Sequence, residues 1–417
     1  MYLRIFKSIF FSFEMIFLLF LISGTIKETE LLSWLPVDAT ILLLLLNFLV
    51  GLYLLFRRNL KILIDNRISI TVTLVGCFFF WILISITWSL SVDYALDKLI
   101  KILLLLGWSF FAGVFIVGSS IERVRRFFSL VVIFSLLFSM QFTFLVFEHD
   151  KSNTLQSLSN DYIVTSTIIS TALLLFSVYY FVTTNKFNIK NTFLILIQLH
   201  LLAIVFSLGA KGPLVALFVS YVVLSLYLFV LQNKSSYFRK TIKYFIYLVY
   251  ITSFLLLVDY EQFRAVERFN DLIINFSEQS DFGGRVWLNL TALSMWEESP
   301  IIGKGIGSFG IYAYNQDFRA YPHNIFTETM SELGLIGLML LISIFYVTLR
   351  MVPRSDNVMF AIPYIVFIFY LVTSQFSGSL SDHRLLFALL GIMSASSIYL
   401  SRPELIKYRK PTKRNLA

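Results

Sequence analysis

Two short segments of the sequence carry cationic side chains beside small residues, an arrangement that suits the binding of an anionic substrate. Lys211 lies in Ser207-Leu-Gly-Ala-Lys-Gly-Pro213, between two long apolar runs, where we expect a tight turn of six or seven non-helical residues with the lysine exposed. Arg285 follows two glycines, the second being Gly284, and shortly precedes Trp287. Glycines let a backbone approach a ligand closely, and a guanidinium can hold a phosphate through two hydrogen bonds.

A third segment places a histidine at the start of another apolar run. His323 follows Pro322, and Asn324 is a typical N-cap for the helix that this run predicts. Glu328 and Glu332 are one helical turn apart and would share a face. Each of the three segments also has an ordinary structural interpretation: a lysine snorkelling at a membrane surface, a turn before an interfacial tryptophan, and a structural histidine. Together they predict a site for one anionic group.

Other common catalytic patterns are missing from the sequence. There is no His-Glu-x-x-His zinc motif, no Gly-x-Ser-x-Gly elbow, no phosphate-binding loop of the Walker type and no Asp-x-Asp pair. Gly303-Lys-Gly305-Ile-Gly307 is rich in glycine but does not follow a strand, so it predicts a tight turn rather than a dinucleotide site. We therefore expect neither a metal ion nor a cofactor.

The elements that position these residues must lie in a membrane. Hydrophobic residues make up 58% of the 417 residues and charged residues only 14%, whereas soluble domains have about 45–50% and about 25%. This composition excludes a soluble globular enzyme and a disordered chain. The single cysteine, Cys77, excludes a disulfide scaffold.

The apolar runs predict an all-α polytopic membrane protein with about twelve transmembrane helices, since a helix of about 20 apolar residues spans a bilayer. The predicted spans are Ile9–Ser23, Ala39–Phe56, Ile70–Leu90, Leu99–Gly118, Phe127–Phe147, Tyr162–Thr183, Thr192–Leu208, Pro213–Leu231, Ile242–Val258, Ile325–Leu349, Val358–Phe376 and Leu385–Leu400. Ionisable residues in the spans are few, with Glu14 as the main one, which disfavours a proton- or ion-coupled transporter.

The basic residues predict the orientation of the chain. With the N-terminus inside, 23 of the 34 lysines and arginines fall in inside segments, so both termini are expected in the cytoplasm. The net charge of +9 then reflects topology and contact with the membrane rather than nucleic-acid binding.

The predicted organisation has four parts. Spans one to nine occupy 1–258, a large outer loop occupies 259–324, spans ten to twelve occupy 325–400, and a basic tail occupies 401–417. The large loop begins with an amphipathic helical pattern, while a second outer loop, at 148–161, is short. The tail is expected to lie against anionic lipid headgroups.

The order of the polar segments resembles the O-antigen ligase/polymerase superfamily of bacterial membrane glycosyltransferases. The resembling segments are Ser207–Gly212, Gly284-Arg285-Val-Trp287, Pro300-Ile-Ile-Gly303-Lys-Gly305 and His323-Asn324…Glu332-Leu-Gly334. They extend from span seven to span ten, about half of the chain. Many members of the superfamily have arginine where this chain has Lys211, and lysine binds phosphate as a point charge rather than as a fork.

The resemblance implies a GT-C-like fold in the bacterial inner membrane with a periplasmic active site and no cofactor. The donor would be a glycan joined to a polyprenol through a diphosphate, and the acceptor a sugar hydroxyl of the lipid A core or of another lipid-linked glycan. The resemblance gives Arg285 and Lys211 contacts with the diphosphate. It gives His323 the role of general base or of a further diphosphate contact, and Glu332 the role of orienting His323 or binding sugar. Asn324, Gly284, Trp287, Gly303 and Gly305 would support the site.

Three activities remain open at this point. The single dominant outer loop favours a ligase, which transfers a finished glycan to the lipid A core. A polymerase performs the same chemistry on a lipid-linked repeat, and often has a second long outer loop. A flippase or another transporter of lipid-linked glycans is the alternative from a different class.

Overall fold

The computed structural model describes residues 10–24, 38–57, 65–148, 162–183, 189–227, 281–352 and 361–401, and the regular elements in these ranges are helices. The elements are α2 (Phe13–Leu21), α4 (Ala39–Phe56), α5 (Asn66–Ser85), η2 (Ile86–Trp88), α6 (Asp93–Lys101), η3 (Ile102–Leu106), α7 (Gly107–Phe115), η4 (Val117–Ser119), α8 (Ile121–Glu148), α10 (Tyr162–Thr183), α11 (Ile189–Leu208), α12 (Lys211–Leu226), α15 (Asp281–Glu297), α16 (Phe309–Tyr314), α17 (Ile325–Leu349), α18 (Ile362–Thr373), η8 (Leu380–Asp382) and α19 (Arg384–Ser401). The predicted all-helical class is confirmed for these ranges.

Six stretches in the described ranges are long and apolar enough to cross a membrane. They are Ala39–Phe56, Asn66–Trp88, Asp93–Ser119, Ile121–Phe144, Tyr162–Tyr179 and Ile325–Leu349. Four shorter apolar helices accompany them, at Thr192–Leu208, Lys211–Leu226, Ile362–Thr373 and Arg384–Ser396. The helices are consistent with a polytopic membrane protein, while the number of twelve spans stays a prediction.

Several predicted features lie outside the described residues. The ninth span, at 242–258, the amphipathic segment at the start of the large loop, most of the short outer loop and the basic tail belong to this group. The four-part organisation of the chain likewise stays a prediction.

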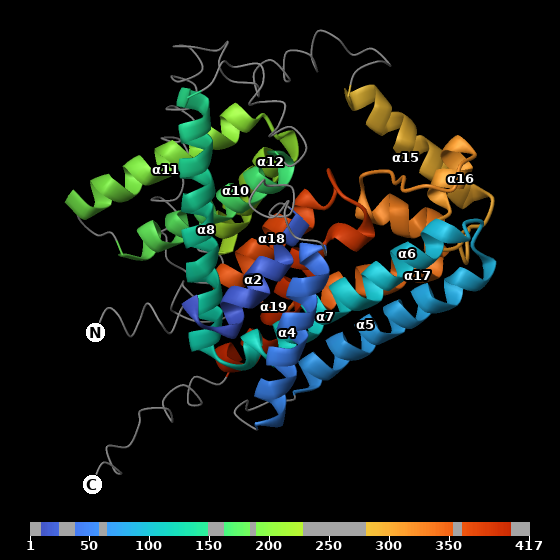
Figure 1. Ribbon diagram of the computed structural model, residues 1–417, viewed down its shortest axis with the longest axis horizontal. Coiled ribbons are helices and arrows are strands. Elements are labelled where there is room, and N and C mark those ends of the chain that lie inside the picture. Colours follow the sequence, from blue (N-terminus) through green and yellow to red (C-terminus); the bar gives the residue numbers. More distant parts are fainter. Residues whose placement is uncertain are drawn as a thin grey trace.

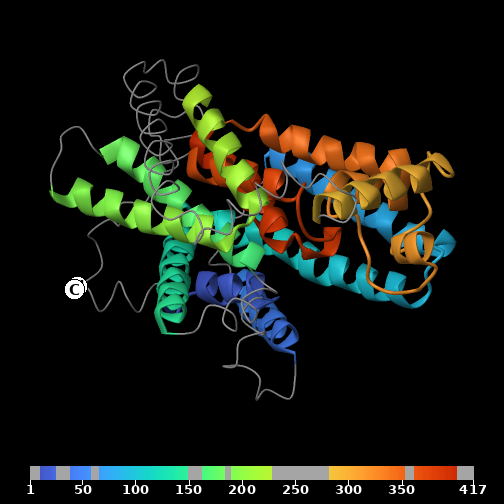
Figure 2. The same cartoon turned by 90° about the horizontal axis from the view of Figure 1, so that it is seen from above.

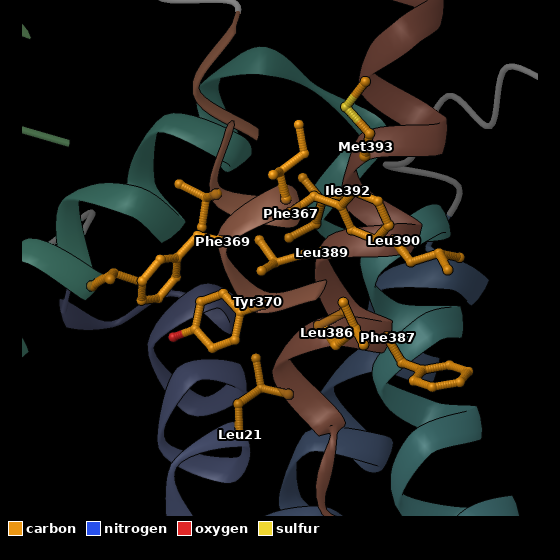
Figure 3. Packing of buried hydrophobic residues seen from close by; sticks show 14 of the residues in the cluster. Leu21, Phe367, Phe369, Tyr370, Leu386, Phe387, Leu389, Leu390, Ile392 and Met393 are labelled. Carbon is orange, nitrogen blue, oxygen red and sulfur yellow. The ribbon is translucent and has the colours of Figure 1, made fainter. Parts of the chain in front are cut away.

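The core is built where α18 and α19 pack against their neighbours. Phe367, Phe369 and Phe387 are fully buried, and Figure 3 shows side chains of α18 and α19 meeting, with Leu21 of α2 close by. The contact of α7 with α19 is close because Gly113 has no side chain: a Cβ there would lie 2.4 Å from a carbonyl oxygen of α19. Small residues at helix interfaces allow such close packing inside membranes.

A group of long helices leads from this core to the region of the candidate site. Figure 1 shows α5, α6 and α17 running alongside one another toward α15 and α16, and Figure 2 shows α15 lying along α17. Because α15 contacts α17, the arginine segment and the histidine segment are brought to the same part of the molecule.

Helix α6 begins at Asp93, six residues before the start of the predicted span at 99–118. Asp317 fixes this start: its carboxylate accepts hydrogen bonds from Ser91 Oγ at 2.6 Å and from the backbone N–H groups of Val92 and Asp93, both at 3.0 Å. A carboxylate at a helix N-terminus satisfies otherwise unpaired donors. Helical structure therefore begins at Asp93, which places Lys98 inside the candidate membrane span.

Candidate functional site

Lys211 lies at the start of α12 rather than within a long turn. Helix α11 ends at Leu208 and α12 begins at Lys211, so Gly209 and Ala210 are the residues between them. The expected turn of six or seven non-helical residues is wrong. Pro213 lies in the first turn of α12, as predicted, where its missing N–H costs no helical hydrogen bond.

The first turn of α12 faces a hollow that also contains Arg285. The hollow is lined by Ala210, Lys211, Gly212, Pro213, Tyr162, Ile163, Arg285, Thr373, Phe376 and Ser377. The N-cap position of α12 is Ala210, which has no side-chain oxygen to accept from the first N–H groups. A helix N-terminus with a lysine and an arginine beside it favours an anion, because the helix dipole and both side chains are positive there.

Arg285 is held in place from the segment that follows α18. It lies on α15, and its Nη1 donates to the carbonyl oxygen of Phe376 at 2.9 Å. Phe376 also packs against the start of α12, since a Cβ at Gly212 would lie 2.8 Å from the Phe376 Cβ. One segment of the chain thus fixes the distance between the arginine and the helix start that carries Lys211.

The supporting residues predicted near Arg285 do not line the hollow. Gly284 lies within α15 rather than in a turn, with open space where a side chain would be. Trp287 is 46% exposed, and its ring lies 5.5 Å from that of Tyr314 on α16.

The histidine segment is tied to the arginine helix through Asn289. Asn289 Nδ2 donates to the carbonyl oxygens of Arg285 at 2.8 Å and Pro322 at 3.1 Å, and Thr327 Oγ1 donates to Asn289 Oδ1 at 2.8 Å. His323, the residue after Pro322, is therefore held near Arg285, although it is not among the residues that line the hollow. The structure brings the three predicted cationic segments into one region, with Lys211 and Arg285 sharing a hollow.

The backbone around His323 is held in an unusual conformation. His323 has a φ of 62°, in the left-handed region that a residue with a Cβ adopts only when its surroundings impose it. The predicted N-cap is confirmed next to it: Asn324 Oδ1 accepts from the backbone N–H groups of Phe326 at 2.9 Å and Thr327 at 3.2 Å. Ile325 N donates to the Ser374 carbonyl oxygen at 3.2 Å, which ties this helix start to the end of α18.

The glycine-rich segment forms the predicted tight turn and docks on a break in α17. The break lies at Gly334, where φ is 66°. Gly305 N donates to the Glu332 carbonyl oxygen at 2.8 Å, and Trp81 Nε1 donates to that of Leu333 at 3.0 Å, so carbonyl groups freed by the break are satisfied. A Cβ at Gly303 would lie 2.4 Å from the Glu332 backbone. Gly303 and Gly305 thus permit close backbone contact and do not line the hollow.

A buried ion-pair cluster lies behind the site. Lys98 Nζ is 2.5 Å from Glu328 Oε1 and 2.7 Å from Glu332 Oε2, and the three side chains are at most 1% exposed. These contacts pair Glu332 with Lys98, while its predicted role in orienting His323 or binding sugar stays a prediction. Glu328 also accepts from Ser379 Oγ at 2.7 Å and from Leu380 N at 2.8 Å. The cluster therefore anchors the segment that carries Phe376.

Further polar groups surround the histidine. Arg319 Nη2 lies 2.8 Å from Asp382 Oδ2 and its guanidinium lies over the ring of Tyr321, which contacts the ring of His323 with centroids 4.5 Å apart. Burial, followed by the charge of Asp382, raises the pKa of Tyr321. Burial lowers the pKa of His383. The phenol of Tyr321 and the imidazole of His383 are thus neutral near pH 7.

Sequence reasoning missed Lys98, Asn289 and the carbonyl group of Phe376. A signal for Lys98 was available: Glu328 and Glu332 lie inside a predicted span, and carboxylates in a membrane need a cationic partner. Asn289 and Phe376 act through polar contacts with distant backbone groups, which no local pattern indicates.

Residues 193–342 match the family model described as O-antigen ligase. No curated protein matches the chain. The match supports the resemblance to the O-antigen ligase/polymerase superfamily and includes Lys211, Arg285 and His323. It ends before the segment that carries Phe376, and Lys98 lies ahead of it. The match supports a ligase- or polymerase-like function in general, in a membrane enzyme of the glycosyltransferase type.

Proposed function

We propose that the chain is an O-antigen ligase-like inverting glycosyltransferase of the bacterial inner membrane. It would move a glycan from polyprenyl diphosphate to a sugar hydroxyl of the lipid A core at the periplasmic face. The observation that carries this proposal is the shared hollow of Lys211 and Arg285 at the uncapped start of α12. Three positive features around one small hollow suit a diphosphate, which is the leaving group of this reaction.

In the proposed reaction, the acceptor hydroxyl attacks the anomeric carbon of the first sugar from the face opposite the diphosphate. The new carbon–oxygen bond forms as the bond to the diphosphate oxygen breaks, and the configuration at the anomeric carbon inverts. Lys211, Arg285 and the N–H groups of the first turn of α12 neutralise the charge that develops on the leaving diphosphate. Because the donor already contains the energy of the transferred bond, the reaction needs no nucleotide.

His323 is proposed as the group that takes the proton of the acceptor hydroxyl or as a further diphosphate contact. Its support is its position: Asn289 holds the preceding residue, Pro322, against the helix of Arg285. The imposed backbone conformation of His323 is typical of residues at functional sites. The two roles differ in pH dependence, since a lost general base is partly replaced by hydroxide at high pH.

The test is glycan transfer by purified variants with a synthetic polyprenyl-diphosphate glycan and an acceptor core. We expect Arg285→Ala to lower turnover about 10²–10³-fold, as the loss of one oxyanion contact does. Arg285→Lys should stay impaired, Lys211→Arg should be tolerated, and His323→Ala should cost about 10²–10⁴-fold if it is the base. Lys304→Ala is the matched control, because Lys304 is a cation of the same loop whose ammonium pairs with Glu298 at 2.7 Å. Normal transfer by Arg285→Ala at normal protein levels would refute the proposal.

The glycans of a strain that lacks the chain separate the proposed ligase from the two alternatives. Loss of a ligase leaves long glycan on polyprenol. Loss of a polymerase leaves the core with a single repeat, and loss of a flippase leaves repeats on the cytoplasmic face of the membrane.

A further inference from the structure

A second, larger cavity lies at the opposite end of the helices from the hollow. Its volume is about 610 Å³, and its lining comes from the first turns of α8 and α18, the later turns of α10, the first half of α11 and the late part of α19. The hollow, by contrast, takes residues from the start of α10 and the end of α18. Ile163 lines the hollow and Phe176 the cavity; 13 residues of helix separate them, which is about 20 Å.

The helices around this cavity contact one another directly. Helix α10 contacts α8 and α18, and α18 contacts α19. Figure 1 shows α8 and α10 on the side of the molecule away from α15 and α16, with α18 and α19 in the middle. The cavity is therefore a feature of the membrane-spanning part of the chain that the proposed transfer reaction does not use.

Most of the lining is apolar. Val124 and Phe128 of α8 and Leu175 and Phe176 of α10 contribute to it. The volume lies within the roughly 300–1,000 Å³ of ordinary ligand sites. In a bilayer, an apolar space between helices offers a lipid acyl chain the same surroundings as the hydrocarbon interior.

One end of the cavity is positively charged. Arg125 contributes to the lining, and no ion pair is described for it within residues 65–148 or the other described ranges. The neighbouring arginines do have an anionic partner: Arg123 and Arg126 contact Glu14 Oε1 at 2.8 Å and 3.2 Å. The charge of Arg125 is thus left for another anion.

The start of α18 adds to this positive end. Ile362 and Pro363, its first two residues, line the cavity, and its N-cap residue, Ala361, has a helical backbone and provides no side-chain hydrogen bond. The dipole of a helix N-terminus favours a phosphate. An apolar cavity with a helix start at one end, and with an arginine that has no ion pair within the described ranges, matches an acyl chain joined to an anionic headgroup.

We propose that this cavity binds one anionic phospholipid, with its phosphate at Arg125 and the start of α18 and an acyl chain between α8 and α10. The occupant is a phospholipid rather than the polyprenol of the donor, because a polyprenol whose diphosphate lies in the hollow, about 20 Å away along α10, has no second phosphate for Arg125. The proposal is independent of the transfer reaction.

The experiment measures lipid retention by the purified full chain with native mass spectrometry, using phosphatidylglycerol and phosphatidylcholine of matched acyl chains. We expect tighter retention of phosphatidylglycerol. Arg125→Ala should lower its apparent affinity about five-fold and leave phosphatidylcholine unchanged, because a basic residue near an anionic membrane surface contributes about 1 kcal/mol. Arg67→Ala is the matched control, since it removes an exposed arginine at the start of another helix that does not line the cavity.

A second variant tests the cavity itself. Ser129 lies on the exposed side of α8 and lines the cavity, so Ser129→Trp should fill the space without disturbing the core and should reduce retention of both lipids. The proposal is overturned if Arg125→Ala weakens phosphatidylglycerol retention no more than Arg67→Ala does, or if Ser129→Trp retains both lipids as the wild type does. Glycan transfer plays no part in this readout, so its outcome is separate from that of the proposed function.

Discussion

The buried cluster of Lys98, Glu328 and Glu332 allows a sharp prediction about stability. Lys98→Met removes the ammonium that both carboxylates contact and keeps a side chain of similar length. Glu328 keeps its hydrogen bonds from Ser379 and Leu380. Glu332 keeps a backbone hydrogen bond from Gly307, while its Oε1 is buried and has no hydrogen-bond partner among the described residues. The variant therefore leaves Glu332 as the least satisfied buried charge.

The expected cost is that of breaking a buried ion pair, about 3–5 kcal/mol. Lys101→Met is the matched control on the same helix. Lys101 forms an ion pair with Asp97 in which the two side chains are 43% and 50% exposed, so loss of this pair should cost less than about 0.5 kcal/mol. Adding Glu332→Gln to Lys98→Met removes the stranded charge and should restore about 1–3 kcal/mol of the loss.

The assay is unfolding of the purified chain in detergent, followed by temperature and by denaturant. If Lys98→Met and Lys101→Met unfold alike, or if Glu332→Gln worsens the Lys98→Met variant, the cluster does not stabilise the fold as the contacts indicate. The Lys98→Met variant should also weaken transfer at temperatures where it stays folded, since Glu328 holds the segment that carries Phe376.

Further predictions concern the helix starts, the topology and the reaction. Burial raises the pKa of Asp317, but hydrogen bonds from Ser91 and from backbone N–H groups outweigh it, so the pKa is lowered. The ionised carboxylate therefore stabilises the fold above about pH 4, and this stabilisation is lost as pH falls through the lowered pKa. Between about pH 5 and pH 3, the melting temperature of the wild type should drop more than that of Asp317→Asn. Asn324→Ala should cost about 1 kcal/mol of unfolding free energy because an N-cap is lost. A reporter at Gln279 should be periplasmic and one after Ser401 cytoplasmic; a cytoplasmic reporter at Gln279 would refute the proposed side of the site. Transfer by the purified chain should persist in excess chelator and without ATP, and loss of activity restored by magnesium would refute the metal-free reaction.

The sequence predicted those parts of the fold that depend on local pattern. The apolar runs at 39–56, 162–183 and 325–349 coincide with helices of the same bounds, the last interrupted at Gly334, because an apolar segment in a membrane satisfies most of its backbone groups by helical hydrogen bonding. The N-cap at Asn324 and the turn at Gly303 were also predictable from local pattern, because a capping oxygen or a flexible glycine acts on backbone groups only a few residues away.

The missed features depend on distant pairings. The start of α6 was placed too late because its cap, Asp317, comes from a loop more than two hundred residues further along the chain. The separation between Lys211 and Arg285 depends on Phe376, which contacts both sides of the hollow and lies beyond the end of the match at residue 342. No pattern within a span can indicate such a partner.

The break at Gly334 explains why the cationic segments and the buried cluster depend on each other. A continuous helix would bond the carbonyl groups before Gly334 internally, and the glycine-rich turn would then have no backbone groups to dock on. With the break, the turn at Gly305 binds the backbone of Glu332, while the side chain of Glu332 binds Lys98. The same helix start holds Ile325 against the end of α18 and Glu328 against Ser379. The hollow is therefore positioned by a helix whose two halves are each fixed from outside, so a substitution at Gly334 should impair transfer without touching any residue that lines the hollow.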